Sequence, residues 1–212
     1  MIEALAYGAF RSFVLFLTCF SIGLAIGAPI ALLAFYRPVV RPFVVLSSAL
    51  LTAIPLLAVL FWVHYPLQMM LAVVWPPVAS SIVVLSIFVA VNFANIGLTA
   101  ALGVHRNYAE VVTVLAIPDR AYFQSVLLPT AARSALPQVL TLAISTIHLT
   151  MFASLIGVEE LFRVTQRLNA QYLKPVELYT AMALAYALIC APLYLVASRV
   201  RTRLSQTGYD VA

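Results

Sequence analysis

The chain has 212 residues and a formal net charge of +5; 64% of the residues are hydrophobic and only 9% are charged. A soluble domain carries roughly 25% charged residues, and it could neither bury nor cover this much apolar surface. The composition therefore excludes soluble enzymes, nucleic-acid-binding proteins and disordered chains, and it predicts an integral membrane protein.

Four runs without Asp, Glu, Lys or Arg predict the membrane spans. They cover residues 12–36, 42–105, 134–158 and 178–198. As one helix the second run would be ~95 Å long, although a span needs only ~20 residues. We therefore expect it to hold two spans, with a turn in the proline-rich stretch 64–77. The sequence predicts five spans in a single transmembrane domain over 1–212, at about 12–36, 43–64, 79–103, 134–157 and 177–199.

The basic residues orient these spans, because five spans place the two termini on opposite sides of the membrane. One side would carry Arg37, Arg41, Arg106, Arg120, Arg133, Arg199, Arg201 and Arg203, and the other Arg11, Arg163, Arg167 and Lys174. Cytoplasmic ends carry the excess of basic residues. We therefore expect a cytoplasmic C-terminus, an external N-terminus and a cytoplasmic loop over 104–133.

The loop has the pattern of a helix-turn-helix hairpin. Apolar residues recur at helical spacing at Tyr108, Val111, Val112 and Leu115, and again at Phe123, Val126 and Leu127. Pro118 breaks the pattern, Asp119 is a good N-cap for the second helix, and Pro129 is expected to stop that helix. Periodicity leaves two alternatives open: the apolar ridge packs against the spans, or a soluble partner protein covers it.

Four segments carry distinctive motifs in order along the chain. They are Ile54-Pro55-Leu56-Leu57; Glu110 followed by Leu128-Pro129 in the loop; Ser154-Leu155-Ile156-Gly157-Val158 with Glu160-Leu161; and Glu177 with Tyr179. In this order they resemble the motifs of bacterial ABC-transporter permeases of the polar amino acid importer group, which includes opine transporters. Glu110 with Leu128-Pro129 resembles the family's coupling motif, with Ala116 at the family's glycine position.

The resemblance implies an all-α membrane protein with the core of a type I importer permease: five transmembrane helices and a cytoplasmic coupling hairpin over 105–129. It also implies a location in the bacterial inner membrane, a second permease chain, a cytoplasmic ATPase dimer and an external solute-binding protein. The chain has no phosphate-loop motif, so a separate subunit is expected to hydrolyse ATP. No catalytic group, cofactor or metal site is expected.

The implied contacts to the ATPase are Glu110, Val111, Val112, Ala116, Asp119, Phe123, Leu128 and Pro129. Glu110 is expected near the start of the first coupling helix, where a carboxylate favours the N-terminal dipole. It could also reach an arginine on the ATPase.

Several charged positions of the family are uncharged here, at Thr52, Asn95 and the stretch 148–150. Polar residues in a span usually face protein or water, and those expected along the translocation path are Thr52, Asn92, Asn95, Thr99, His148, Thr150 and Ser154. Hydrogen bonding between helices is the alternative interpretation. The missing charges favour a heterodimer whose other half supplies them; the second explanation is a solute held by neutral groups.

The predicted outer loop begins with Glu159 and Glu160, and their spacing to Arg163 predicts ion pairs on one helix face. This segment is either an amphipathic outer helix, or a gate or docking site for the binding protein. In the first span, Gly23 and Gly27 predict close helix packing. A secondary carrier or channel without an ATPase, and a mainly structural half of a heterodimer, are the alternative functions.

Overall fold

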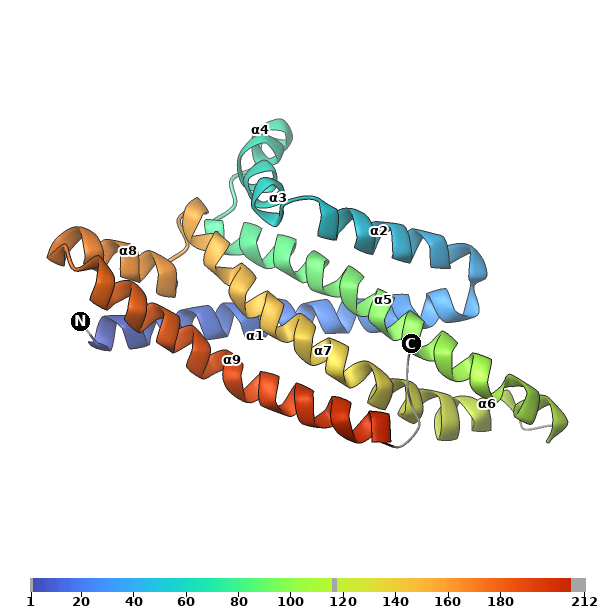
Figure 1. Cartoon of the computed structure of the whole chain (residues 1–212). Helices are drawn as coiled ribbons and strands as arrows, with labels where there is room; N and C mark the ends of the chain where they lie inside the picture. The colour runs from blue at the N-terminus through green and yellow to red at the C-terminus, as the bar shows by residue number, and fades with distance from the viewer. Residues whose placement is uncertain (1, 116–117, 207–212) are drawn as a thin grey trace.

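The computed structural model describes residues 2–115 and 118–206, which form an elongated bundle of helices (Figure 1). Within these residues, four long helices are apolar enough to cross a membrane. They are α1 (Ile2–Tyr36), α5 (Pro77–Val114), α7 (Leu128–Thr150) with its flanking turns, and α9 (Pro175–Gln206). The predicted all-α membrane fold is confirmed. A bent pair of helices accounts for a fifth crossing if the pair is one span.

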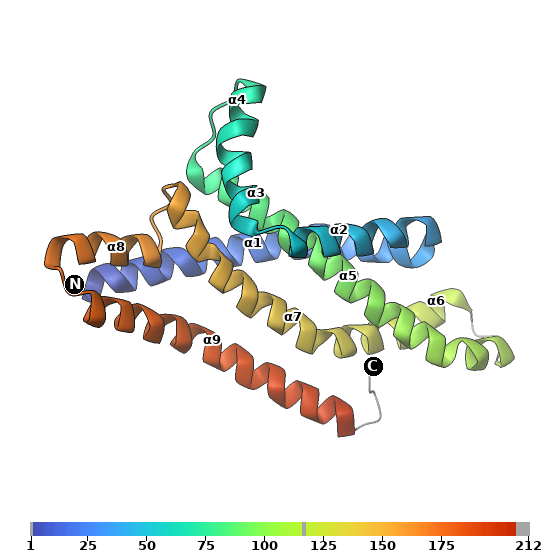
Figure 2. The ribbon, with the colours of Figure 1, turned by 45° about the horizontal axis from the view of Figure 1, so that its top comes forward.

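The predicted second span, 43–64, is not one helix. α2 (Arg41–Ala53) follows a short 3₁₀ turn (Pro38–Val40) and ends before Pro55. The chain then continues through α3 (Leu56–Trp62), a π-helical segment (Val63–Leu67) and α4 (Gln68–Leu71), at 93° to α2. Proline disfavours helical geometry in the residue before it, and Ile54 is extended. Figure 2 shows α3 and α4 standing away from the bundle.

The hairpin is built from the ends of the spans rather than from separate helices. α5 runs without a break from Pro77 to Val114. On the other side, α6 (Asp119–Tyr122) and a π-helical segment (Phe123–Leu127) lead directly into α7. Two expectations are therefore wrong. Pro129 lies in the first turn of α7, where proline is tolerated, and Pro118 holds the N-cap position predicted for Asp119.

The central contact of the bundle is between α1 and α5, and two glycines of α1 allow it. A Cβ atom on Gly23 would lie 2.4 Å from Val89 Cγ1, and one on Gly27 would lie 2.5 Å from the carbonyl oxygen of Ala90. Small residues let helix backbones approach in a membrane. The predicted close packing at Gly23 and Gly27 is confirmed.

We expect Gly27→Ala to destabilise the protein, because the added methyl meets backbone that cannot rotate away. Overpacking of this kind costs about 1–3 kcal/mol. The measurement is the melting temperature of the detergent-purified chain, followed by circular dichroism. Gly103→Ala in α5 is the matched control: its Cβ meets nothing within 4 Å, and alanine favours a helix by up to ~1 kcal/mol. Equal melting temperatures for the two variants would contradict this account of the packing.

α8 (Leu161–Tyr172) lies beside the N-terminal part of α1, after a 3₁₀ segment (Met151–Ile156) that follows α7 (Figure 1). Its buried face is made by Leu161, Val164 and Leu168, whose spacing is that of an amphipathic helix. The amphipathic helix predicted for this segment is therefore present.

Candidate functional site

A cluster of uncharged polar side chains joins α2 to α5. Ser48 Oγ donates a hydrogen bond to Asn92 Oδ1 at 3.1 Å, and Asn95 Nδ2 donates to Ser48 Oγ at 3.4 Å. Thr52 Oγ1 lies 3.5 Å from the same Asn92 oxygen. The structure thus brings together three of the predicted path residues: Thr52, Asn92 and Asn95. Ser48, which is buried at the centre of the cluster, was missed because one serine in an apolar helix carries no signal of its partners.

The polar cluster lies next to the break between α2 and α3. Thr52 is two residues before the extended Ile54, and its hydroxyl also donates to the carbonyl oxygen of Ser48. Asn95 is half-buried, and in the described part of the chain no hydrogen bond reaches its Oδ1 atom.

The other predicted path residues lie apart from this cluster. His148 is exposed on α7, and its Nε2 atom is 3.6 Å from Cys190 Sγ on α9. Thr150 and Ser154 are fully buried, and each hydroxyl donates to a backbone carbonyl three residues earlier. This geometry favours packing roles for Thr150 and Ser154. Thr99 is exposed on α5, one turn beyond Asn95.

The apolar ridge of the hairpin packs mainly on itself. Val104, Tyr122 and Leu127 form a buried cluster, with Val112 and Phe123 partly buried against it. The tip is different, because Val114 is 82% exposed and Leu115 is 64% exposed. The two alternatives for the ridge therefore apply to different parts of it: the base is internal packing, and the tip is free to meet a partner.

The structure leaves three of the predicted coupling positions undescribed in whole or in part. Ala116 lies outside the described residues, and the side chains of Glu110 and Val111 are likewise not described. The backbone at Glu110 belongs to the last two turns of α5. The predicted N-terminal dipole contact is therefore wrong, since Glu110 lies near a C-terminal helix end, where a carboxylate is disfavoured.

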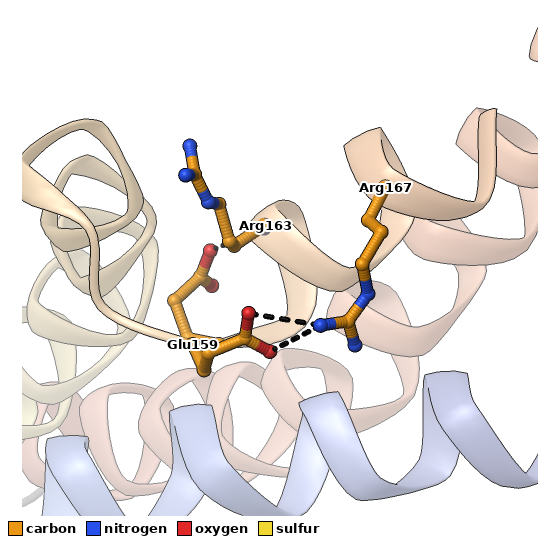
Figure 3. A network of polar contacts seen from close by, with 4 residues as sticks. Glu159, Arg163 and Arg167 are labelled. Atoms are coloured by element: carbon orange, nitrogen blue, oxygen red, sulfur yellow. Dashed lines mark hydrogen bonds and ion pairs between the residues drawn. The ribbon is translucent and has the colours of Figure 1, made fainter. Parts of the chain in front are cut away.

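The predicted ion pairs at the start of α8 are also wrong. Glu159 pairs with Arg167, eight residues on, at 2.9 Å, and the Arg163 guanidinium points away from Glu159 (Figure 3). Glu160 instead accepts the backbone N–H of Arg163 at 2.8 Å and so caps the helix. The i,i+3 and i,i+4 rule holds only inside a helix, and α8 begins after both glutamates.

Glu160 is completely buried, and burial raises the pKa of its carboxyl group above the ordinary value, against the opposing effect of the hydrogen bonds that it accepts. A carboxyl whose pKa is raised by folding stabilises the protein most when it is protonated, and this contribution is lost as the pH rises through the raised pKa.

We therefore expect the melting temperature of the wild type, minus that of Glu160→Gln, to shrink as the pH rises above about 4, the ordinary pKa of a glutamate. Glu159→Gln is the control, because it removes one negative charge from the neighbouring, partly exposed carboxyl, as Glu160→Gln does from the buried one. A difference for Glu160→Gln that stays constant over this range would contradict the raised pKa.

A second polar network was missed by sequence reasoning. Gln68 is buried, and its Nε2 atom lies 3.0 Å from His64 Nδ1 and 3.1 Å from Ser80 Oγ. Its Oε1 atom accepts the backbone N–H of Trp75 at 2.5 Å. These contacts hold α4 and the following turn against the start of α5. Through its contacts to Ser80 and Gln68, His64 anchors the arm formed by α3 and α4.

Comparison with known proteins decides the family. No family model matches the chain. The L-cystine transport system permease protein TcyB of Bacillus subtilis is 30% identical over 188 residues, which cover 88% of this chain and 80% of TcyB. The chain belongs to the permease family of amino acid ABC transporters. The glutamine transport system permease protein GlnP of Escherichia coli K12 is 28% identical over 128 residues, or 60% of this chain and 58% of GlnP.

Solved structures show the same fold. A crystal structure of an amino acid ABC transporter with histidines superposes with a TM-score of 0.85 at 19% identity, over 96% of this chain and 95% of that one. The inward-facing MetNI methionine ABC transporter gives 0.73 at 17% identity, over 95% and 97%. As an amino acid ABC permease, the chain is a transmembrane subunit of an ATP-driven importer and a multi-pass inner-membrane protein. It is a transport subunit rather than an enzyme, and its family implies ATPase and solute-binding partners.

Proposed function

We propose that this chain forms one half of the translocation path for a polar amino acid or a related opine. The names of TcyB and GlnP, which refer to cystine and glutamine, support this class of solute. We further propose that the N-terminus is external and the C-terminus cytoplasmic, on the basis of the distribution of basic residues.

The observation that carries the proposal is the polar cluster of Ser48, Thr52, Asn92 and Asn95 beside the helix break at Pro55. Broken helices at membrane depth are tolerated where they line a cavity, and transporters place solutes there. Amide and hydroxyl groups can bind the ammonium and carboxylate of an amino acid without a buried charge of their own. In this proposal the free Oδ1 atom of Asn95 accepts a solute N–H.

The hairpin over 105–129 is proposed as the contact to the cytoplasmic ATPase. α5 carries Asn92 and Asn95 and runs without a break into the first arm of the hairpin. The second arm passes directly into α7, which carries His148. Because helices are stiff, a displacement of the hairpin tip by ATP-driven closure would rotate both lining helices as rigid bodies.

The partner in the membrane is proposed to be a distinct permease chain, forming a heterodimer. The polar cluster contains no charged group, and a second, different half would supply charge for solute binding. The mainly structural role remains the second candidate, because Ser48, Thr52 and Asn92 already satisfy one another by hydrogen bonds. The exposed side of α8, with Arg163 and the Glu159–Arg167 pair, is proposed to dock the solute-binding protein.

The test is an affinity purification of the tagged chain from its native membrane, with the associated subunits identified by mass. An ATPase together with a second permease supports the heterodimeric importer. An ATPase with this chain alone means a homodimer, in which Asn95 and its neighbours must hold the solute unaided. Recovery of no ATPase would overturn the proposed coupling through the hairpin. ATP-dependent uptake of labelled L-glutamine and L-cystine into vesicles containing the purified complex then tests the solute class.

A further inference from the structure

The carboxyl group of Glu160 connects three helices. It lies directly before α8, with none of its surface exposed. Oε1 accepts the backbone N–H of Arg163 at 2.8 Å, while Oε2 accepts hydrogen bonds from Ser12 on α1 at 3.0 Å and Tyr186 on α9 at 3.2 Å. A carboxyl group in a helix-capping position needs only the first of these contacts. The other two tie α8 to separate parts of the bundle.

The connection to α1 is rigid. Ser12 donates to Glu160 and at the same time accepts the backbone N–H of Leu161 at 3.0 Å. One turn earlier in α1, Gly8 allows a close approach, because a Cβ atom there would lie 2.9 Å from the Cα atom of Leu161. These contacts hold the start of α8 closely against the N-terminal part of α1.

The connection to α9 leads to His148. Tyr186 is 8% exposed, and its ring centre lies 6.2 Å from that of His148 on α7. One turn later on α9, Cys190 Sγ lies 3.6 Å from His148 Nε2. Tyr186 and Cys190 also pack against Ala143 and Ile147 of α7 in a buried cluster. The hydroxyl of Tyr186 adds the polar contact that joins this part of α9 to Glu160.

We propose that Glu160 is a positioning residue that transmits a displacement of α8 to α1 and, through Tyr186, to α9 and the His148 region. This inference rests on the proposed function, in which a solute-binding protein docks on α8. The start of α9 packs directly on α8, where Leu178 lies against Val164 and Leu168. The Glu160–Tyr186 contact carries the displacement further along α9, to the part opposite His148. Without that contact, this part of α9 follows α8 less closely.

The test compares Tyr186→Phe with wild type in the complete complex in lipid vesicles. The measured quantity is the ratio of ATP hydrolysis with and without the co-purified solute-binding protein, loaded in parallel with L-glutamine and L-cystine. This ratio does not depend on how much complex folds. We expect it to fall about tenfold, the factor that corresponds to losing one hydrogen bond, while basal hydrolysis is retained. Glu160→Gln serves as a second variant and should lower the ratio in the same direction.

The matched control is Tyr179→Phe, which removes a hydroxyl from the same helix while its ring stays packed 6.5 Å from Phe162. It should keep the wild-type ratio. If Tyr186→Phe keeps the wild-type ratio, the positioning role is overturned and the importer function is not affected. The same holds if hydrolysis with and without the binding protein falls by the same factor. If the binding protein does not stimulate the wild-type complex at all, the proposed function fails first.

Discussion

Replacing both Asn92 and Asn95 by leucine is expected to abolish ATP-driven uptake while the protein still inserts and assembles. The two amides form the α5 side of the polar cluster, and leucine leaves a solute no hydrogen-bonding group there. Each lost contact to a polar solute corresponds to about a tenfold loss, so uptake should fall about a hundredfold. Leucine is favourable in a membrane span, and insertion should therefore be unaffected. The measurement is ATP-dependent uptake of labelled L-glutamine and L-cystine by vesicles.

Ser48 and Ser47 provide a sharper comparison within α2. Ser48 Oγ contacts both asparagines, whereas Ser47 is exposed and its hydroxyl donates to the carbonyl oxygen of Phe43. Ser48→Ala should reduce uptake and Ser47→Ala should not, although both remove one hydroxyl from the same helix. Wild-type uptake in the double leucine variant would assign the cluster to helix packing, which is the alternative interpretation for such residues.

The sequence was a good guide to the spans and a poor one to their shape. Runs without charge locate apolar helices because the bilayer excludes charge along their whole length. They say nothing about direction, so the 93° bend between α2 and α3 was missed. Pro55 alone does not predict the bend, because a proline can bend a membrane helix or lie in its first turn without bending it. Pro66 lies within a continuous π-helical segment, and Pro129 lies in the first turn of α7.

Contacts between side chains were predictable only where both partners share a regular helix. Asn92 and Asn95 were expected on one face, and both contact Ser48. Ser48 is 44 residues away from Asn92 in the chain, and no local pattern joins them. The predicted ion pairs to Arg163 are wrong because they assumed that Glu159 and Glu160 lie inside the helix, whereas α8 begins at Leu161. The burial of Glu160 is set by α1 and α9 together, and neither is near it in sequence.

The largest effect outside the path is expected for Glu110→Lys, which should uncouple ATP hydrolysis from uptake in a complex that still assembles. Glu110 matches the glutamate of the family's coupling motif and is proposed to contact a basic residue of the ATPase; lysine would turn this attraction into repulsion. The substitution should not weaken α5 itself. Glu110 lies within the last two turns before Val114, where a cation is favoured over a carboxylate by about 0.3–1 kcal/mol.

The measurement is uptake per ATP hydrolysed in vesicles containing the complete complex. Asn107→Lys adds a positive charge to an exposed position of the same helix, one turn earlier, and should keep the wild-type value. Helix content, followed by circular dichroism, should be unchanged in both variants. Normal coupling in Glu110→Lys would mean that the ATPase does not contact this carboxylate. The contact would then be expected at the exposed tip residues Leu115 and Asp119. Loss of coupling in both variants would instead point to the total charge of the hairpin, because the two substitutions share only their direction of charge change.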